Sequence, residues 1–511
     1  MPSSVYLIGA GPGDPGLITV RGLRCLESAD VVLYDHLVHA RLLRHARPDA
    51  EKIDVGPAAP RALEQEAICY LLAEKAREGK TVAHLKRGDP FVFDSGGPEA
   101  LFLHEQGIRF EVVPGVPIGI AGPAYAGIPI TYPGGGDTLA FVRGNEDESK
   151  TRAAVDWTSL ARLDGTIVCY AGSGQLPHIA SALLSHGRPP DDTAALVYGA
   201  TLPTQETHVG TLDEIAKVVK HSTDRRPAVL VVGRVAALRE HLQWFDVMPL
   251  FGKRVLVTRP RGQAGELVDA LESVGAEAVE APMIQILPPE DYGPLDRACR
   301  DIANFDCIVF SSANAVESFI ERLLASPNDL RALKNVKLCA VGPTTALKLA
   351  DYGLKMDLTP HEFRAEALVR AILETTPVRG FRVLLPRANI GRELIADELR
   401  KQGAEVTEVV AYRTEATELG RDGEPDIYRM LLDRRIDVVT FTSASAVRSL
   451  VLALGAEPAA DLLRTTLVAC IGPITADAAA KHHIQTSIMP SQYTVPALVE
   501  AIVEYFEAKK P

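Results

Sequence analysis

The sequence lacks the cysteine spacing that marks a zinc site or a disulfide framework. Its seven cysteines are an odd number and lie far apart, and they form neither a C-x-x-C motif nor a Cys/His pair at zinc spacing. They are Cys25, Cys69, Cys169, Cys299, Cys307, Cys339 and Cys470. We therefore expect reduced thiols, no metal site and a cytoplasmic location.

An excess of basic residues is also missing. The chain has 54 Lys and Arg against 66 Asp and Glu, which gives a formal net charge of −12. Broad binding of nucleic acid or of an anionic membrane surface requires a positive potential. We therefore expect neither partner, and an anionic ligand has to find a locally basic pocket.

The sequence shows neither a basic leader nor an unbroken membrane span. The first Lys or Arg is Arg21, whereas a strand-like run already begins at Val5, so we expect no signal peptide. One uncharged run, 112–136, is long enough to cross a bilayer, but five prolines interrupt it. We interpret this run as buried loops and short elements.

The first half alternates short β-branched runs with helical patterns, which predicts mainly parallel α/β sheets. At about 150 residues per domain, a chain of 511 residues predicts three or four compact units. Pro and Gly interrupt the pattern at 244–253, where we expect the main domain boundary. The strand candidates are Val5–Gly9, Val31–Tyr34, 81–85, Phe110–Val113, 139–142, Thr166–Ala171, 194–198, Ala228–Val232 and 255–258.

The second half contains an internal repeat. The segment from Val255 matches the segment from Val383 at a constant shift, which aligns Arg259 with Arg387. Two further pairs of segments match in the same order, 310–316 with 441–447 and 340–346 with 470–476. The repeat predicts two similar α/β lobes.

A cleft between two lobes is a common ligand site, so the matched loops are candidates for its rim. They are Ser311-Ser312, Gly342-Pro343, Thr442-Ser443 and Gly472-Pro473. Turn formation and helix capping are the alternative role for each loop.

The first half opens with a glycine-rich loop, GAGPGDPG at 9–16, between a strand and a helix. Glycines permit close backbone approach to a ligand. The loop is not a dinucleotide fingerprint, because Pro12 and Pro15 interrupt the spacing and remove backbone donors. Taken alone, the loop is a weak signal, and a structural turn is the default interpretation.

Three further segments follow in order: DVVLYDHLV at 30–38, LKRGDPFVFDSGG at 85–97 and VPGVPIGIAGPAYAGIPIT at 113–131. With the glycine-rich loop they resemble the tetrapyrrole (precorrin/corrin) methylase family, and within it the uroporphyrinogen-III C-methyltransferases. The resemblance runs from about Val5 to Trp244, and we assign it residues 1–245.

This resemblance implies a two-domain α/β methylase fold with S-adenosylmethionine in the cleft between the domains, and a homodimer formed through this half. The family's donor-site positions fall, motif by motif, on these residues of this sequence: Pro12, Gly88, Asp89, Ile118, Ala171 and Ala228. For Asp89, a turn or cap role is the alternative.

Asp35 ends a predicted strand, where its carboxylate can accept a proton from a pyrrole or ring carbon during methylation. An ordinary exposed turn is the alternative. A pyrrole carbon is enamine-like, so positioning and desolvation can supply most of the catalysis without a nucleophilic side chain or a metal.

Several positions depart from the methylase pattern and remove cations from the expected cleft. The family's FGRGGEE loop has Asp94 and Ser95 here, and so has no Arg. Fewer cations weaken charge-assisted hydrogen bonds to an octacarboxylate, unless Arg87 or Arg143 substitutes for them. The other departures are Gly56-Pro57-Ala58 for GKR, Ile130-Thr131-Tyr132-Pro133 for LTHR, Arg143-Gly144-Asn145 for TGH and Tyr170-Ala171-Gly172 for YMG.

The motifs of the second half, from VLVTRP at 255 to CIGPITA at 470, resemble uroporphyrinogen-III synthases over 254–507. The resemblance implies a two-lobed α/β synthase fold, which we assign to 252–511. The implied lobes are 252–286 with 414–511, and 287–413. It also implies two paired linkers, 284–286 and 411–414, and the repeat sets Ile284 opposite Tyr412.

The implied reaction closes hydroxymethylbilane to uroporphyrinogen III with inversion of ring D and without a cofactor. Such a reaction depends on shape and exclusion of water more than on strong acid–base groups. Tyr412 is the candidate for assisting departure of the hydroxyl, since a phenol donates a hydrogen bond while presenting an apolar ring. Packing between the lobes is the alternative role for Tyr412.

Basic and hydroxyl side chains supply candidates for binding the substrate's carboxylates. Arg259, Arg387 and Arg392 lie at ends of strands or starts of helices, with surface salt bridges as the alternative. Hydroxyl and backbone donors come from Ser312, Thr442, Ser443, Gly472 and Thr475, and helix capping equally explains Ser443.

The leading hypothesis is a bifunctional enzyme that makes uroporphyrinogen III and methylates it twice to precorrin-2, toward sirohaem or cobalamin; uroporphyrinogen III is also a haem precursor. A second hypothesis keeps the synthase but makes the methylase half a degenerate binding or regulatory domain. A third regards both halves as scaffolds and predicts no affinity for S-adenosylmethionine or tetrapyrroles.

Overall fold

The computed structural model describes residues 5–35, 38–56, 63–135, 137–144, 155–171, 175–221, 226–281, 284–358, 360, 365–389, 394–416 and 426–509. By its internal contacts the chain divides into two compact units. The first comprises Met1–Arg254, Ala270–Ala278 and Val503–Pro511, and the second comprises Val255–Asp269 and Val279–Ile502.

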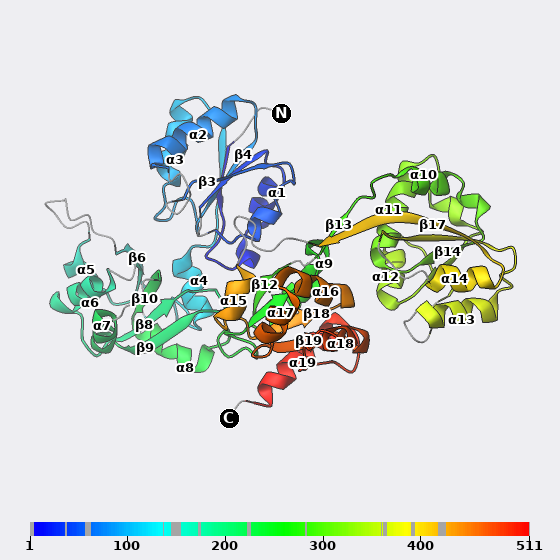
Figure 1. The fold of residues 1–511 in the computed structure, drawn as a ribbon. Coiled ribbons are helices and arrows are strands. Elements are labelled where there is room, and N and C mark those ends of the chain that lie inside the picture. Colours follow the sequence, from blue (N-terminus) through cyan, green and yellow to red (C-terminus); the bar gives the residue numbers. More distant parts are fainter. Residues whose placement is uncertain are drawn as a thin grey trace. The chain divides into compact units, whose positions relative to one another are not determined.

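The first sheet has five parallel strands in the order β3-β2-β4-β1-β5. Helix α1 covers one face, and α2 and α3 cover the other (Figure 1). Strands β1 and β4 are neighbours, but the chain leaves β1 toward one face of the sheet and β4 toward the other. Parallel sheets bind ligands at the carboxyl edge between two such strands. The elements are β1 (Val5–Gly9), α1 (Val20–Glu27), β2 (Val31–Tyr34), β3 (Glu51–Asp54), α2 (Gln65–Arg77), β4 (Val82–Lys86), α3 (Gly96–Glu105) and β5 (Phe110–Val113).

The second sheet is mixed, in the order β6-β7-β10-β8-β9, with α5 to α7 on one face and α4 on the other. The prediction of mainly parallel strands is wrong here, because β10 runs antiparallel to both β7 and β8. Strand β9 is also antiparallel to β8, since the connection 199–205 is too short for a parallel crossover. The elements are α4 (Ile118–Tyr125), β6 (Leu139–Arg143), α5 (Trp157–Ala161), β7 (Thr166–Ala171), α6 (Leu176–Ser185), β8 (Thr193–Tyr198), β9 (Glu206–Thr211), α7 (Leu212–His221), β10 (Ala228–Val232) and α8 (Arg239–Leu242).

Helix α4 shows how the uncharged run 112–136 folds. It has eight residues and contains Pro123, so the interpretation of this run as short elements is confirmed. Within the described parts of the chain, no helix is both long and apolar enough to cross a membrane.

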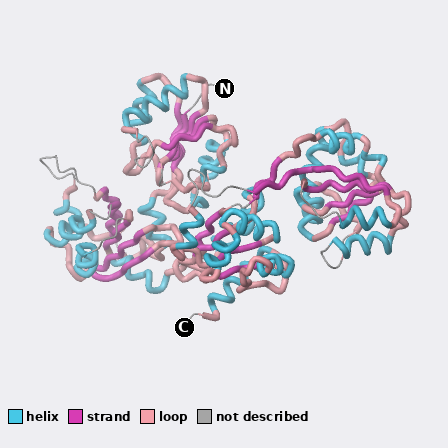
Figure 2. Tube along the Cα trace, viewed as in Figure 1, coloured by secondary structure: helices cyan, strands magenta, loops and turns pink. Residues whose placement is uncertain are grey.

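The chain after residue 253 forms two further sheets, β12-β11-β18-β19 and β13-β17-β16-β14-β15. The predicted repeat is confirmed, because β12, β11, β18 and β19 match β17, β16, β14 and β15 in order. Figure 2 shows helices around both groups of strands. Their elements are β11 (Arg254–Val257), α9 (Arg261–Ser273), β12 (Glu277–Glu280), β13 (Ile284–Leu287), α10 (Gly293–Arg300), β14 (Cys307–Phe310), α11 (Ala313–Ala325), β15 (Lys337–Ala340), α12 (Pro343–Asp351), α13 (Ala365–Thr375), β16 (Arg382–Ala388), α14 (Leu394–Lys401), β17 (Glu405–Ala416), α15 (Ile427–Leu432), β18 (Val438–Phe441), α16 (Ala444–Leu454), α17 (Ala456–Leu463), β19 (Leu467–Cys470), α18 (Pro473–Ala480) and α19 (Val495–Glu507).

The two linker segments pair as predicted, but in a different register. Strand β13 runs antiparallel to the end of β17, with Ile286 opposite Thr414. Ile284 lies opposite Ala416 and not Tyr412, because Tyr412 pairs with Ala388 of β16 across an irregularity in the ladder. The first part of β17 therefore pairs with β16, and its last part pairs with β13.

Candidate functional sites

Three loops meet at the carboxyl edge of the first sheet with almost no side-chain volume between them. A Cβ added to Gly9 would lie 2.4 Å from the nitrogen of Gly115, and one added to Gly115 would lie 2.1 Å from the carbonyl oxygen of Gly88. Gly11 and Gly88 also exchange backbone hydrogen bonds of 3.3 and 2.8 Å. These glycines bring the backbones after β1, β4 and β5 together.

Asp89 fastens two of these loops through its carboxylate. One oxygen accepts a hydrogen bond from the Phe91 nitrogen at 2.8 Å, and the other from the Gly115 nitrogen at 3.0 Å. The turn role foreseen for Asp89 is therefore present, and it shapes the loops that carry Gly88.

The start of α4 joins these loops to the second sheet. A Cβ on Gly88 would lie 3.8 Å from the Ile118 nitrogen, and one on Gly119 would lie 2.4 Å from the Tyr170 hydroxyl. Tyr170 precedes Ala171, which lies opposite Ala228 in the antiparallel ladder. Backbone contacts thus link the six donor-site candidates or their immediate chain neighbours, and we call these six residues the donor strip: Pro12, Gly88, Asp89, Ile118, Ala171 and Ala228.

Tyr170 is a polar group at this strip that sequence reasoning did not single out as a ligand. Its hydroxyl is buried beside the Gly119 backbone and forms no hydrogen bond of normal geometry with any described residue. Its ring packs edge-on against Phe93 at 5.0 Å, and Phe93 lies in the loop after β4 with a positive φ of 55°. Burial raises the pKa of Tyr170, so the phenol keeps its proton at neutral pH.

A buried charge network, also not foreseen, supports the loop after β4. Glu99 is completely buried and accepts hydrogen bonds from Lys86 and Gln65, both at 2.8 Å. His84 Nδ1 lies 3.0 Å from the same carboxylate. Burial alone would raise the pKa of Glu99, but His84 and Lys86 outweigh it and lower the pKa to about 2.

Replacing Glu99 by glutamine is expected to destabilise the first compact unit by about 3 kcal/mol at pH 7, since it removes one of the two carboxylates that pair with the buried Lys86, the other being Asp94 at 2.9 Å. Because folding lowers the pKa from 4.5 to about 2, this stabilisation is complete above pH 4.5 and is lost as the pH falls toward 2. Both tryptophans of the chain, Trp157 and Trp244, lie in this unit, so urea unfolding followed by their fluorescence measures it.

The matched control is Glu105→Gln, because Glu105 is exposed on the same helix. If the free energy of unfolding differs between wild type and Glu99→Gln by the same amount from pH 7 to pH 3, the assignment of a charge to Glu99 is contradicted.

Asp35 and two arginines lie at the same carboxyl edges. Asp35 follows β2 and is partly exposed, and its carbonyl accepts a turn hydrogen bond from Val38. Arg87 follows β4 directly, and Arg143 ends β6 opposite Tyr170. Both arginines are exposed, and neither forms an ion pair within the described parts of the chain. The other departures fall partly outside the described residues, at Pro57, Ala58, Asn145 and Gly172.

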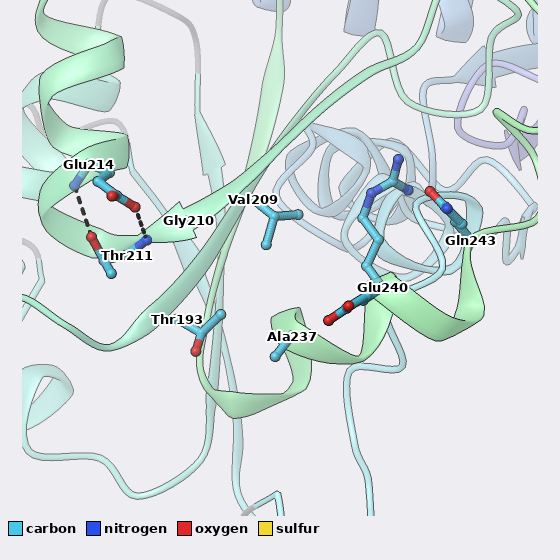
Figure 3. Close-up of a pocket in the computed structure, with 9 residues that line it drawn as sticks. Thr193, Val209, Gly210, Thr211, Glu214, Ala237, Glu240 and Gln243 are labelled. Carbon is cyan, nitrogen blue, oxygen red and sulfur yellow. Dashed lines mark hydrogen bonds between the residues drawn. The ribbon is translucent and has the colours of Figure 1, made fainter.

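A pocket of about 530 Å³ lies at the end of the second sheet where β8 begins, which is the end away from Ala171 and Ala228. In Figure 3, Thr193, Val209 and Glu240 face this pocket, while Thr211 and Glu214 hydrogen-bond to each other beside it. It contains none of the predicted site residues, and Thr193 starts the strand β8 that ends beside Ala228.

In the second unit, the structure brings together two candidates that are distant in sequence. The hydroxyls of Tyr412 and Ser312 lie 3.0 Å apart. Ser312 also caps α11 by accepting from the Ala315 nitrogen, and the Tyr412 ring is 8% exposed in a core with Phe310 and Phe319. Tyr412 therefore has both a packing role and an oriented hydroxyl.

The repeat-related arginines differ in their surroundings. Arg387 forms an ion pair with Glu408 at 3.0 Å, as the salt-bridge alternative foresaw. Arg259 has a more distant neighbour, Glu266 at 3.9 Å. In both arginines the buried Nη1 has no hydrogen bond of normal geometry among the described residues. Burial lowers the pKa of Arg259. Arg392 lies outside the described residues.

The remaining candidates lie at the carboxyl ends of β18 and β19. Ser443 caps α16 by accepting from the Ala446 nitrogen at 3.2 Å, so the capping role is present. Gly472 caps α18, where a Cβ would lie 3.1 Å from the Tyr493 ring. Thr475 is buried in the first turn of α18, and Thr442 is half-buried before Ser443.

Comparison with known proteins gives matches for both halves. A family model for Tetrapyrrole (Corrin/Porphyrin) Methylases matches residues 4–216, and one for Uroporphyrinogen-III synthase HemD matches residues 265–500. The porphyrin biosynthesis protein HemD of Ruminiclostridium josui is 35% identical over 501 residues, which cover 98% of this chain and 97% of that protein.

Two further matches concern the first half. The S-adenosyl-L-methionine-dependent uroporphyrinogen III methyltransferase of Methanosarcina barkeri is 43% identical over 239 residues, which are 47% of this chain and 94% of that protein. A crystal structure of uroporphyrin-III C-methyl transferase from Thermus thermophilus complexed with S-adenyl homocysteine is 38% identical, with a TM-score of 0.40, and covers 46% of this chain and 100% of that one.

Proposed function

The chain belongs to the family of porphyrin biosynthesis proteins that join a tetrapyrrole methylase to a uroporphyrinogen-III synthase, and from this premise we propose that both halves are active. The second half closes hydroxymethylbilane to uroporphyrinogen III with inversion of ring D. The first half methylates that product twice with S-adenosylmethionine and gives precorrin-2. The observation that supports the methylase assignment is the donor strip, whose residues or their chain neighbours are linked by backbone contacts from the loop after β1 to β10.

The composition of the donor strip supports its assignment to an adenosyl group. Glycine, alanine and the turn residues Pro12 and Asp89 surround Ile118, and the buried Tyr170 hydroxyl lies beside Gly119. When bound, the donor supplies an electrophilic methyl group on a sulfonium. The chain itself orients the pyrrole carbon, excludes water, and takes up the proton released from the tetrapyrrole at the Asp35 carboxylate.

We assign the methylase to residues 1–245 and the synthase to 252–511. The synthase lobes are 252–286 with 414–511, and 287–413. The sheets support these bounds, since β10 ends at Val232 and β11 begins at Arg254. The strands of β12-β11-β18-β19 come from the two segments of the first lobe.

Arg87 and Arg143 supply the positive charge that the methylase pattern otherwise loses. Each lies beside the donor strip, since Arg87 adjoins Gly88 and Arg143 lies opposite Tyr170. Guanidinium groups pair well with the acetate and propionate carboxylates of a uroporphyrinogen. We therefore assign both to binding of the tetrapyrrole.

Replacing Arg87 and Arg143 together by glutamine is expected to raise KM for uroporphyrinogen III by about tenfold, because exposed charge pairs are worth about 0.2–1 kcal/mol each and charge-assisted hydrogen bonds add to that. The value of kcat is expected to change by less than about twofold. The readout is the steady-state rate of methyl transfer at varied uroporphyrinogen III. Arg162→Gln, an exposed change at the end of α5, is the control. An unchanged KM in the double variant counts against this assignment.

The synthase reaction rests on Tyr412 and Ser312 in one lobe and on the donors at Thr442, Ser443, Gly472 and Thr475 in the other. Arg259 is the better candidate of the two repeat-related arginines for a substrate carboxylate, because Arg387 already pairs with Glu408. Ring closure is tested by supplying hydroxymethylbilane alone and separating the uroporphyrinogen isomers. The type III isomer is the expected product, and release of only the non-inverted isomer would refute the synthase assignment.

A further inference from the structure

The glycine-rich loop before α1 is tied to α4 through the carboxylate of Asp14. One Asp14 oxygen accepts from the Gly16 nitrogen at 2.7 Å, within the loop itself. The other accepts from the Tyr125 hydroxyl at 2.7 Å, across 111 residues of sequence. Tyr125 is the last residue of α4, whose first residue, Ile118, belongs to the donor strip.

This bond is part of a closed circuit of four residues. The Asp14 nitrogen donates to the Thr201 hydroxyl at 3.2 Å, and the Thr201 nitrogen donates to the Gln205 side-chain oxygen at 3.0 Å. The Gln205 amide then donates to the Tyr125 carbonyl at 3.3 Å. Thr201 and Gln205 are 2% and 3% exposed, so water competes little for these groups.

The Tyr125 ring is held from the other side by the segment that follows α8. Trp244 and Phe245 pack edge-on against it at 5.0 and 4.8 Å. The Trp244 indole also donates to the Ala124 carbonyl at 2.9 Å. The aromatic packing and this bond fix the end of α4, and so fix where the Tyr125 hydroxyl points.

We propose that Tyr125 is a positioning residue for the methyl donor: through Asp14 it holds the backbone around Pro12 in the conformation that binds S-adenosylmethionine, and Trp244 holds Tyr125 in turn. This inference rests on the proposed methylase function. It assigns a role to four residues that do not themselves belong to the donor strip, namely Asp14, Tyr125, Thr201 and Trp244.

The backbone hydrogen bonds between Gly11 and Gly88 hold one end of the loop, and the segment that follows Gly11 needs a further restraint. Gly11 and Gly13 have φ values of 83° and 149°, which other residues rarely adopt, so the free loop has many conformations to lose on binding. A loop already fixed in its bound conformation raises affinity by removing that cost. Burial and the neighbouring Asp14 carboxylate raise the pKa of Tyr125, so its hydroxyl remains a donor throughout the working pH range.

The test is Tyr125→Phe in the full chain, which removes the hydroxyl and keeps the ring between Trp244 and Phe245. Titration calorimetry with S-adenosylhomocysteine is expected to show Kd raised about tenfold, the effect of losing a hydrogen bond to a charged group. KM for S-adenosylmethionine is expected to rise equally, with kcat at saturating donor and KM for uroporphyrinogen III within about twofold of wild type. Tyr6→Phe, on β1, is the matched control.

Two further variants keep the proposal testable if Tyr125→Phe also lowers stability. Thr201→Val removes the acceptor for the Asp14 nitrogen and Trp244→Phe removes the indole donor, and each is expected to raise the donor Kd while the Tyr6→Phe control does not. An unchanged Kd in all three variants overturns the proposal. A loss of kcat in parallel with the unfolding midpoint, at constant Kd, also overturns it. Wild-type protein that does not bind S-adenosylhomocysteine at all would instead refute the proposed methylase function itself.

Discussion

Replacing Asp35 by asparagine is expected to lower kcat for methylation of uroporphyrinogen III by about 10²–10⁴-fold, the range for loss of a general base. Asparagine has nearly the same shape as aspartate but cannot accept a proton at neutral pH. The turn that holds the residue uses its carbonyl and the Val38 nitrogen, so the backbone is kept. The expected result is therefore a loss in kcat with little change in KM for the donor.

The measurement is the rate of methyl transfer from labelled S-adenosylmethionine, with ring closure of hydroxymethylbilane measured on the same preparation. Asp54→Asn is the matched control, because Asp54 ends the neighbouring strand β3 and caps the Gly56 nitrogen at 2.9 Å. A decrease of less than tenfold for Asp35→Asn, or an equal decrease for Asp54→Asn, would support the turn role of Asp35 and contradict the role of base.

Replacing Tyr412 by phenylalanine is expected to slow ring closure about 10²-fold, because departure of the hydroxyl loses its hydrogen-bond donor. The ring is buried in the core of its lobe and keeps its packing in the variant. Substrate that the enzyme no longer closes can close without inversion, so the product is expected to shift toward the non-inverted isomer. Methylation of preformed uroporphyrinogen III is expected to remain unchanged.

Ser312→Ala tests whether the 3.0 Å contact orients the Tyr412 hydroxyl. A smaller decrease than that of Tyr412→Phe is expected, since the phenol itself remains. Tyr352→Phe, in the same lobe, is the control, and chromatography of the uroporphyrinogen isomers gives the product ratio. Normal rate and product ratio in Tyr412→Phe would leave Tyr412 with a packing role alone.

The central strands of the first unit were predictable because they are apolar runs bounded by turns. Strands β1, β2, β7 and β10 have the limits that the sequence predicts. Strands β3 and β9 were not predicted, since Glu51–Asp54 and Glu206–Thr211 are edge strands with mostly polar, solvent-facing side chains. A strand that buries neither face leaves no alternation of hydrophobicity to detect.

The loops of the donor strip were predictable for a different reason: glycine and proline mark them locally in the sequence. The Asp14–Tyr125 bond and the Glu99 network have no such mark, because their partners are separated along the chain and each residue type is common alone. The same limit applies to Arg387, since only the pairing of β16 with β17 brings Glu408 beside it. The fold of each half thus follows from patterns in the sequence, whereas the supporting contacts of the sites require the tertiary structure.

The most direct test of the central claim is a count of methyl groups. Purified protein is supplied with uroporphyrinogen III and methyl-labelled S-adenosylmethionine under reducing, anaerobic conditions. The molecular mass of the tetrapyrrole product is then measured by mass spectrometry. Two labelled methyl groups per tetrapyrrole are predicted for an active methylase half. Unlabelled uroporphyrinogen III from a preparation that still closes hydroxymethylbilane would contradict the account, and would make the first half a domain that binds tetrapyrrole or donor without turnover.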